Sequence, residues 1–276
     1  MAHVHLPDGF ELLATSAGVA GVRSSVKPAL VALGILERSV FERTRRAGEL
    51  VGRGRGRVVA VPLGGPGGGR AVIRHCRRAG PLAKLLGDIY FTRWRPLREL
   101  CAAEAARTAG VPTPEPLAAL VWKRGPVWSG DLMVREVPDA VPLEAWLRRR
   151  PDATPGTLRP ILDALAAAFA KLFAANVYHP DLHAGNVLVQ QRGRPVLHII
   201  DFDRARQLPA LPRRLRDKML FRFNRALLKR RLSPRPVTRT NRLRLCERLG
   251  VTGDRAETRR FLNACEAHLR WHAWRY

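Results

Sequence analysis

Two short apolar runs separated by a polar turn constrain the fold of this chain more than any other feature. The runs are Asn186-Val-Leu-Val189 and Val196-Leu-His-Ile-Ile200, and residues 190–194 between them are polar and contain a glycine. Runs of this length and composition predict two buried β-strands joined as a hairpin. The hairpin would bring Asn186, before the first strand, close to Asp201, directly after the second.

The residues at that end of the hairpin suit phosphoryl transfer. This chemistry depends mostly on positioning and on neutralising charge, and it needs a carboxylate beside the attacking hydroxyl. Asp181 lies five residues before Asn186, so we expect it to be the catalytic carboxylate. Hard cations such as Mg²⁺ prefer oxygen ligands. Asn186 and Asp201 are therefore the candidate metal ligands.

The two segments resemble kinase motifs, in which a loop H-R-D-x-x-x-x-N is followed by D-F-G. Here the loop reads H-P-D-L-H-A-G-N and the second motif reads D-F-D. By this resemblance His179 would brace the loop backbone. His183 stands where protein kinases usually carry lysine and is a candidate to face a phosphate, with a hydrogen-bonded loop histidine as the alternative. His198 lies within a strand, which favours a packing role.

A glycine-rich segment precedes this site by more than one hundred residues. Gly52-Arg-Gly-Arg-Gly56 is followed by two apolar runs, 57–63 and 70–74, which predict a pair of strands. Glycine lets backbone N–H groups approach phosphates closely. Gly52, Gly54 and Gly56 are candidates to cover a nucleotide, although hairpin turns use the same residues.

Two residues are candidates for the positively charged side chain that binds the nucleotide phosphates. Arg74 ends the second of these strands, where the kinase motif V-A-I-K carries lysine, and Lys84 follows ten residues later. Arginine can bind phosphate through two donors but is not equivalent to lysine. Glu99 is our choice for the helix carboxylate that pairs with this cation. Glu104 is its rival, and a solvated position is the alternative for either.

The remaining pattern predicts an α+β chain with two lobes. Residues 1–40 are weakly periodic and are expected to form an N-terminal extension, or a first strand with a short helix. Residues 41–137 form a small β-rich N-lobe, and residues 138–276 form a larger, mainly helical C-lobe. Helices are expected at 95–109 and 158–175, and another along an apolar stripe with a four-residue repeat. The stripe comprises Leu211, Leu215, Met219, Phe223 and Leu227.

The charge of the chain implies an anionic partner. The formal net charge is +26, and residues 204–248 carry sixteen arginine or lysine residues against two acids. Such an excess suits a membrane surface, nucleic acid or a phosphorylated substrate. No apolar run is long enough to predict a transmembrane helix, and no signal peptide is evident. The four cysteines are scattered and predict reduced thiols in a cytosolic protein.

Over about residues 50–230 the chain resembles the 3-deoxy-D-manno-octulosonic acid (Kdo) kinases, which belong to the lipopolysaccharide kinase group of the protein-kinase-like fold. Cys76 replaces a common aromatic residue of that family, and Ala79 replaces a common glycine. The resemblance is carried by Val72-Ile-Arg-His-Cys-Arg-Arg-Ala-Gly80, Gly87-Asp-Ile-Tyr90, Gly110-Val-Pro-Thr-Pro114, Tyr178–Val189 and Ile200-Asp-Phe-Asp203.

This resemblance implies ATP-dependent phosphorylation of a Kdo hydroxyl, the 4-hydroxyl, on the Kdo–lipid A precursor. Asp181 would be the base, and Asn186 and Asp201 would hold Mg²⁺. The acidic glycolipid acceptor would place the protein peripherally on the cytoplasmic face of the inner membrane, and no nucleic-acid partner is expected. The alternatives are a heptose kinase or other small-molecule kinase, a protein kinase, and a non-catalytic binder of anionic surfaces. The oligomeric state stays open.

Overall fold

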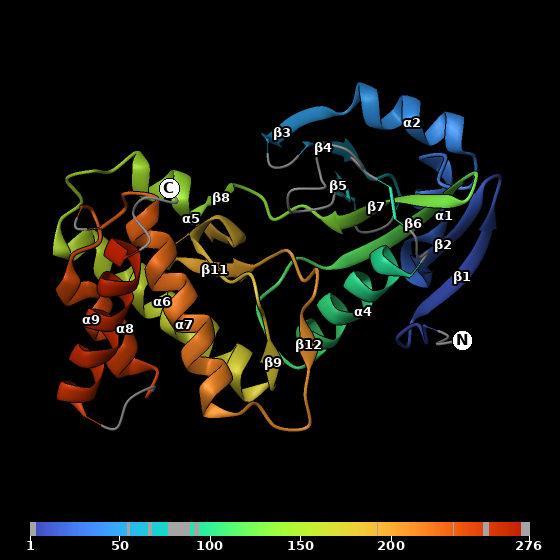
Figure 1. Ribbon diagram of the computed structural model, residues 1–276. Helices are drawn as coiled ribbons and strands as arrows, with labels where there is room; N and C mark the ends of the chain where they lie inside the picture. Colours follow the sequence, from blue (N-terminus) through green and yellow to red (C-terminus); the bar gives the residue numbers. More distant parts are fainter. Residues whose placement is uncertain are drawn as a thin grey trace. The chain divides into compact units, whose positions relative to one another are not determined.

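The computed structural model describes residues 4–53, 56–65, 68–76, 89–90, 94–191, 193–233, 235–250 and 254–271. The chain folds into two compact units. The first unit comprises Met1–Ala105 with Pro114–Glu136, and the second comprises Ala106–Thr113 with Val137–Tyr276 (Figure 1). The first unit is rich in strands and the second is mainly helical, which is the α+β architecture expected from the sequence.

An antiparallel sheet of seven strands, in the order β1-β2-β6-β7-β5-β4-β3, forms the centre of the first unit. The strand pair expected over 57–63 and 70–74 is confirmed as β4–β5, and β5 also pairs with β7. The hairpins β3–β4 and β6–β7 complete this part of the sheet. The strands are β1 (Phe10–Thr15), β2 (Gly18–Arg23), β3 (Glu49–Arg53), β4 (Arg57–Pro62), β5 (Arg70–His75), β6 (Pro116–Arg124) and β7 (Val127–Arg135).

Residues 10–23 form two strands of this sheet and a short helix follows, so the expected strand with a short helix is present in place of an N-terminal extension. The hairpin β1–β2 joins the sheet because β2 pairs with β6, and Ala20 and Val22 of β2 are fully buried. The turn η1 (Ser24–Val26) and helix α1 (Lys27–Ala32) follow, and α2 (Arg38–Ala47) leads into β3. Small residues and glycines made the strand pattern weak in the sequence, so only the long-range pairing with β6 reveals it.

The sheet of the first unit is covered on both faces. Along β6, Leu120 and Trp122 pack into one core cluster, together with Leu30 of α1 and Phe41 of α2. Ala119 and Val121, which alternate with them, pack into a second cluster with Leu97 and Leu100 of α4 (Arg95–Thr108). A strand that is apolar on both faces belongs to the centre of a covered sheet, and the helix expected at 95–109 is confirmed as one of its covers.

The second unit contains the predicted hairpin. Strands β10 (Val187–Gln190) and β11 (Val196–Ile199) pair antiparallel, and β8 (Ala140–Pro142) extends this sheet beside β10. The turn η2 (Ala184–Asn186) leads directly into β10. A smaller two-stranded sheet joins β9 (Val177–Tyr178), just before the motif H-P-D, to β12 (Arg206–Gln207), just after the motif D-F-D. Both motifs are therefore held between paired strands.

Helices make up most of the second unit. They are α5 (Leu143–Arg148), α6 (Pro155–Ala174), α7 (Arg213–Lys229), α8 (Arg239–Arg248) and α9 (Arg255–Trp271). Helix α6 begins earlier than expected because Thr154 caps it, accepting a hydrogen bond from the N–H of Thr157, and proline follows at the first turn. Helix α7 carries Leu215, Met219, Phe223 and Leu227 of the predicted stripe, whereas Leu211 lies before its first residue. Helix α9 packs against α7 and α8, and α6 packs against α8 (Figure 1).

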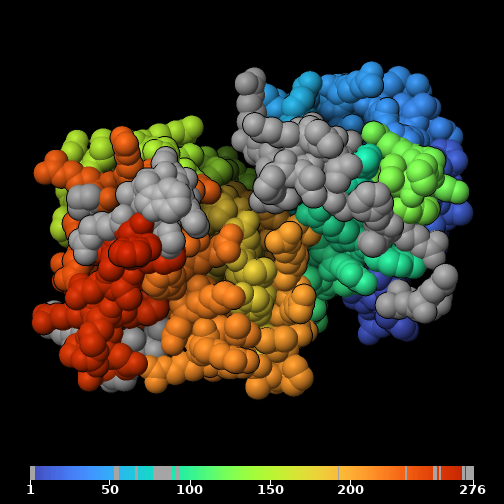
Figure 2. Space-filling view, in the orientation of Figure 1, coloured from blue at the N-terminus to red at the C-terminus, as the bar shows by residue number. Residues whose placement is uncertain are grey.

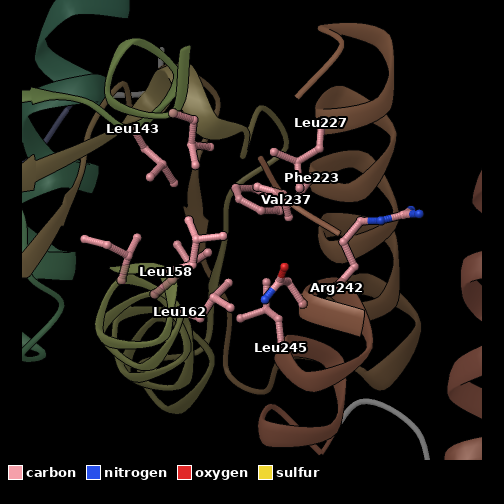
Figure 3. Close-up of a pocket in the computed structure, with 12 residues that line it drawn as sticks. Leu143, Leu158, Leu162, Phe223, Leu227, Val237, Arg242 and Leu245 are labelled. Carbon is pink, nitrogen blue, oxygen red and sulfur yellow. The ribbon is translucent and has the colours of Figure 1, made fainter. Parts of the chain in front are cut away.

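The centre of this helical core encloses a small apolar cavity of about 20 Å³ (Figure 3). Leucine side chains from α5, α6, α7 and α8 surround it, with Phe223 on one side. A space of this size holds about one water molecule, and none of the predicted site residues lines it. It is a packing feature of the core. In the part of the chain that the structure describes, no helix combines the length and the apolar character needed to cross a bilayer.

Candidate active site

The segment between β9 and β10 forms a loop, and Asp181 lies within it. The Asp181 side chain is partly exposed, and its Oδ1 atom accepts a hydrogen bond from Nη2 of Arg222 at 2.8 Å. Arg222 belongs to α7, which packs against both β9 and η2. The carboxylate expected to act as the base is thus held in a defined position by a charge from a distant helix.

Asn186 joins this loop to the segment that contains Asp201. Its Nδ2 atom donates to the carbonyl oxygen of Asp181 at 3.0 Å, and its own carbonyl oxygen accepts from the N–H of Ile200 at 3.0 Å. Asp201 follows Ile200 directly and adopts a left-handed backbone conformation with φ of 67°. The hairpin expectation that Asn186 and Asp201 meet at one end is therefore supported by the backbone pairing.

The donor set at this end of the hairpin fits Mg²⁺. The amide nitrogen of Asn186 must be the atom that faces the Asp181 carbonyl, because a carbonyl only accepts hydrogen bonds. This orientation leaves the amide oxygen of Asn186 for another partner. Together with the carboxylate of Asp201 it supplies the hard oxygen ligands that Mg²⁺ favours.

His179 holds the two motifs together from within the core. The residue is fully buried, and its Nε2 atom lies 3.2 Å from the carbonyl oxygen of Ile200, to which it donates. Its backbone N–H donates to Sδ of Met219 in α7, and its ring packs edge-on against Phe202. Burial lowers the pKa of His179, so the ring is neutral and the Nε2–H tautomer satisfies this bond. It braces the loop, as expected.

His183 is a hydrogen-bonded loop histidine. Its Nδ1 atom accepts the backbone N–H of Gly185 at 3.0 Å, where it caps the start of η2. In the neutral ring the proton must then reside on Nε2, which is a donor. The alternative of a hydrogen-bonded loop histidine is therefore the contact observed, and a role of His183 at a phosphate stays a prediction.

In the first unit, Arg74 and Glu99 form an ion pair. Arg74 lies on β5, and its Nη2 atom donates to Oε1 of Glu99, a buried residue of α4. Glu104 on the same helix instead accepts from Nη2 of Arg23 at 2.6 Å. The Nε atom of Arg23 also donates to the carbonyl oxygen of Pro116 at 2.9 Å. Of the two rival carboxylates, the structure thus brings only Glu99 to Arg74.

Two of the three glycine candidates, Gly52 and Gly56, lie at the β3–β4 hairpin. Gly52 pairs with Val58 near the end of the hairpin, and the strand has an irregularity between Leu50 and Gly52. Gly56 follows at the turn into β4. Gly54 and Lys84 lie outside the described residues, so the choice between Arg74 and Lys84 as the phosphate-binding cation stays a prediction.

Sequence reasoning missed the contribution of α7 to the loop. The stripe predicted the helix and its buried face, yet it gave no sign that Met219 would accept a bond from His179 or that Arg222 would reach Asp181. A further arginine, Arg230 at the end of α7, pairs with Glu144 of α5. In a segment with sixteen basic residues, charge alone does not single out one of them.

Comparison with known proteins identifies one family. The family model described as "Lipopolysaccharide kinase (Kdo/WaaP) family" matches residues 41–245. A 3-deoxy-D-manno-octulosonic acid kinase of Vibrio parahaemolyticus is 31% identical over 171 residues, which cover 59% of this chain and 68% of the relative. A protein of the same name from Vibrio cholerae is 33% identical over 139 residues, which cover 49% of this chain and little more than half, 56%, of the relative.

Two further similarities extend the match. A 3-deoxy-D-manno-octulosonic acid kinase of Xylella fastidiosa is 30% identical over 187 residues, covering 63% of this chain and 71% of the relative. The solved structure titled "WaaP in complex with acyl carrier protein" superposes with a TM-score of 0.59 at 18% identity, covering 96% of this chain and 98% of the other, which shows the fold. This chain therefore belongs to the lipopolysaccharide kinase (Kdo/WaaP) family and is a kinase with a kinase-like fold.

Proposed function

We propose that this kinase transfers the γ-phosphoryl group of ATP to the 4-hydroxyl of a Kdo sugar on the Kdo–lipid A precursor, in the assembly of the lipopolysaccharide core. The observation that carries the proposal is the hydrogen-bonded connection of Asp181 to Asn186 and of Asn186 to Ile200. This connection brings the candidate base Asp181 close to Asn186 and to the segment that contains Asp201. Phosphoryl transfer needs such a carboxylate beside the ligands of the metal ion. The relatives in Vibrio and Xylella that carry the Kdo kinase name support the acceptor class.

In this proposal Asp181 is the residue that handles the proton. Its Oδ atoms would accept a hydrogen bond from the acceptor hydroxyl, orient the oxygen for attack and take its proton as the bond to phosphorus forms. Arg222 keeps the carboxylate in place through the 2.8 Å contact. The bond of Asn186 to the carbonyl of Asp181 fixes the main chain of the same residue. Side chain and backbone of the base are thus held by different elements.

The roles for nucleotide and metal follow from the same contacts. Asn186 and Asp201 would hold Mg²⁺, which neutralises charge on the phosphates when bound. Arg74 would bind the phosphates of ATP, with its guanidinium oriented by Glu99. His183 would donate from Nε2 to a phosphate oxygen, because its Nδ1 is occupied by Gly185. Gly52, Gly54 and Gly56 would cover the nucleotide with their backbone.

A peripheral position on the cytoplasmic face of the inner membrane is part of the proposal. Helices α7 to α9 form much of the viewed surface of the second unit (Figure 2). The exposed basic residues of α7 are Arg213, Arg214, Arg216, Lys218, Arg222 and Lys229. Near an anionic leaflet each such side chain contributes about 1 kcal/mol of binding. Binding to anionic vesicles should therefore weaken with added salt. An affinity that does not change with salt concentration would contradict an electrostatic attachment.

The decisive test is transfer of labelled γ-phosphate from ATP to the purified Kdo–lipid A precursor. Wild-type protein is compared with Asp181→Ala and with Asp152→Ala, a control at an exposed position of the same unit. Loss of a general base costs ~10²- to 10⁴-fold in rate, so label should appear with wild type and the control and nearly vanish with Asp181→Ala. Thermal melts verify that the variants fold.

Each other outcome removes a defined part of the proposal. Turnover retained by Asp181→Ala would exclude Asp181 as the base. Absence of label on this lipid, together with label on heptosylated acceptors, would overturn the Kdo assignment while keeping the kinase. Absence of both transfer and magnesium-dependent ATP binding would contradict the nucleotide roles given to both units.

A further inference from the structure

Arg222 is the charge beside Asp181 that the sequence motifs do not explain. It lies 41 residues beyond Asp181 in the chain, outside both motifs, and donates through one atom, Nη2. A guanidinium has five N–H donors in a planar fork. The Arg222 side chain is 46% exposed, so donors beyond the one used on Asp181 remain open to a ligand that enters from solvent.

Helix α7 holds Arg222 in a fixed position relative to the loop. One turn before it, Met219 accepts the backbone N–H of His179 at 3.1 Å. Directly after it, the buried ring of Phe223 packs edge-on against Phe169 of α6 with ring centroids 5.2 Å apart. Arg222 is therefore carried by a helix that is anchored on both sides of it, which is the preorganisation that a recognition residue needs.

Asn186 and Arg222 contact different groups of Asp181. Asn186, the candidate metal ligand, contacts the main-chain carbonyl of Asp181. Arg222 contacts the carboxylate. In the proposed function the phosphates bind beside the metal ligands Asn186 and Asp201, and the acceptor hydroxyl binds to the carboxylate of Asp181. An acceptor that hydrogen-bonds to Asp181 therefore brings its neighbouring groups within reach of the Arg222 guanidinium.

We propose that Arg222 binds the carboxylate of an acidic sugar acceptor while Asp181 binds the hydroxyl to be phosphorylated. The inference rests on the proposed function and names the group that selects the substrate. The planar fork of arginine matches a carboxylate through two parallel hydrogen bonds. An octulosonic acid carries such a carboxylate on the same sugar as its hydroxyls, whereas a neutral hexose or heptose does not. Arg222 thus distinguishes a sugar acid from a neutral sugar.

The test compares two acceptors that differ in one group. The Kdo–lipid A precursor is used beside the same lipid with its Kdo carboxylate converted to the neutral carboxamide. Wild type, Arg222→Gln, Arg222→Lys and the control Arg159→Gln are assayed for kcat/KM with each acceptor. Arg159 is an exposed arginine of α6 in the same unit, so its replacement makes the same change of charge. The ratio of the two kcat/KM values cancels any loss that affects both acceptors equally.

A charge-assisted bidentate contact predicts that wild type and Arg159→Gln prefer the carboxylate acceptor by ~10- to 100-fold. Arg222→Gln should lower this preference to ~3-fold or less, and Arg222→Lys should keep part of it because the charge remains. The KM for ATP should be unchanged in Arg222→Gln.

Three results would overturn the inference. An equal loss with both acceptors means that Arg222 only positions Asp181. A raised KM for ATP with an unchanged preference places Arg222 at the phosphates. An Arg222→Gln enzyme that matches wild type with both acceptors removes Arg222 from the site. If wild type phosphorylates neither acceptor, the result contradicts the proposed function, and therefore also this inference, which rests on it. Thermal melts, with Arg222→Lys as the milder variant, identify any loss of folding.

Discussion

The guanidinium of Arg74 donates to the carboxylate of Glu99 and so connects β5 to the buried face of α4. Five residues further along α4, the buried carboxylate of Glu104 serves a different partner, Arg23. Two glutamates of one helix, alike in burial, thus have different partners, and the proposed function gives a nucleotide-binding role to the pair with Glu99 alone. The difference is directly testable.

Glu99→Gln should lower kcat/KM for ATP, because the neutral amide no longer orients Arg74 toward the phosphates. Loss of a charge-assisted hydrogen bond predicts a decrease of ~10- to 100-fold. Glu104→Gln should leave kcat/KM of the folded enzyme within ~2-fold but lower the free energy of unfolding by ~1–3 kcal/mol, since Arg23 loses a buried charged partner. Steady-state kinetics and urea denaturation of both variants measure this. Equal kinetic effects of the two substitutions would contradict the assignment.

Gly185→Ala should disturb the catalytic loop more than the fold. A Cβ atom at Gly185 would lie 2.9 Å from Nη1 of Arg230 and 3.0 Å from Cε1 of His183. The arginine end can shift, but the His183 ring is held by the N–H of Gly185 itself. A displacement of this kind near the reacting atoms predicts a loss of roughly 10- to 100-fold in kcat.

The matched control is Gly156→Ala, where the new Cβ meets only Oγ1 of Thr154 at an ordinary 3.7 Å. This variant should keep wild-type kcat. Single-turnover phosphorylation assays with both variants are the measurement. A Gly185→Ala enzyme with normal turnover would show that the His183 position does not matter for transfer.

The free energy of unfolding should fall below about pH 6.5, which is the unperturbed pKa of histidine. Burial lowers the pKa of His198, whose buried ring nitrogens have no hydrogen-bond partner among the described residues, and burial likewise lowers the pKa of His179. In acid the unfolded chain takes up protons that the folded chain does not, so the free energy of unfolding falls. The fall begins as the pH drops through the unfolded pKa and stops below the folded pKa. Each histidine contributes a slope of at most ~1.4 kcal/mol per pH unit.

Urea denaturation between pH 5 and 8 tests this linkage. His198→Leu should show a shallower pH dependence than wild type, because one titrating group is gone. His5→Gln, at an exposed histidine, should reproduce the wild-type slope. An unchanged slope in His198→Leu would mean that His198 is protonated equally in both states.

Gly52→Ala should weaken nucleotide binding without lowering the stability of the fold. Gly52 has no positive φ, and a Cβ there would contact only Cβ of Val58 at an ordinary 3.6 Å, so the free energy of unfolding should stay within ~0.5 kcal/mol. Backbone that approaches phosphates closely has no room for a side chain. The KM for ATP should therefore rise, whereas Gly64→Ala, with no atom within 4 Å of its Cβ, should leave it unchanged. A normal KM in Gly52→Ala would exclude Gly52 from nucleotide contact.

Local pattern predicted much of the second unit. The strands β10 and β11, the turn between them and the helix α7 follow from apolar runs and a four-residue stripe. The proximity of Asn186 to the segment with Asp201 follows from the same hairpin, because a short turn leaves few ways to pair two strands. The strands β1 and β2 were not predicted as part of the sheet, because their burial depends on pairing with β6, about one hundred residues away.

The sequence by itself determined where the candidate catalytic and metal-binding residue types lie along the chain. Asp181, Asn186 and Asp201 lie within short segments whose spacing is fixed by one turn and one hairpin. Only the tertiary structure decided which charged side chains pair with one another. Arg222 pairs with Asp181, Arg74 pairs with Glu99, and Arg23 pairs with Glu104. Periodicity fixes which face of a helix is buried, but an ion pair requires two side chains from distant elements to meet at a few ångströms. That meeting depends on how helices and strands pack, which no local pattern contains.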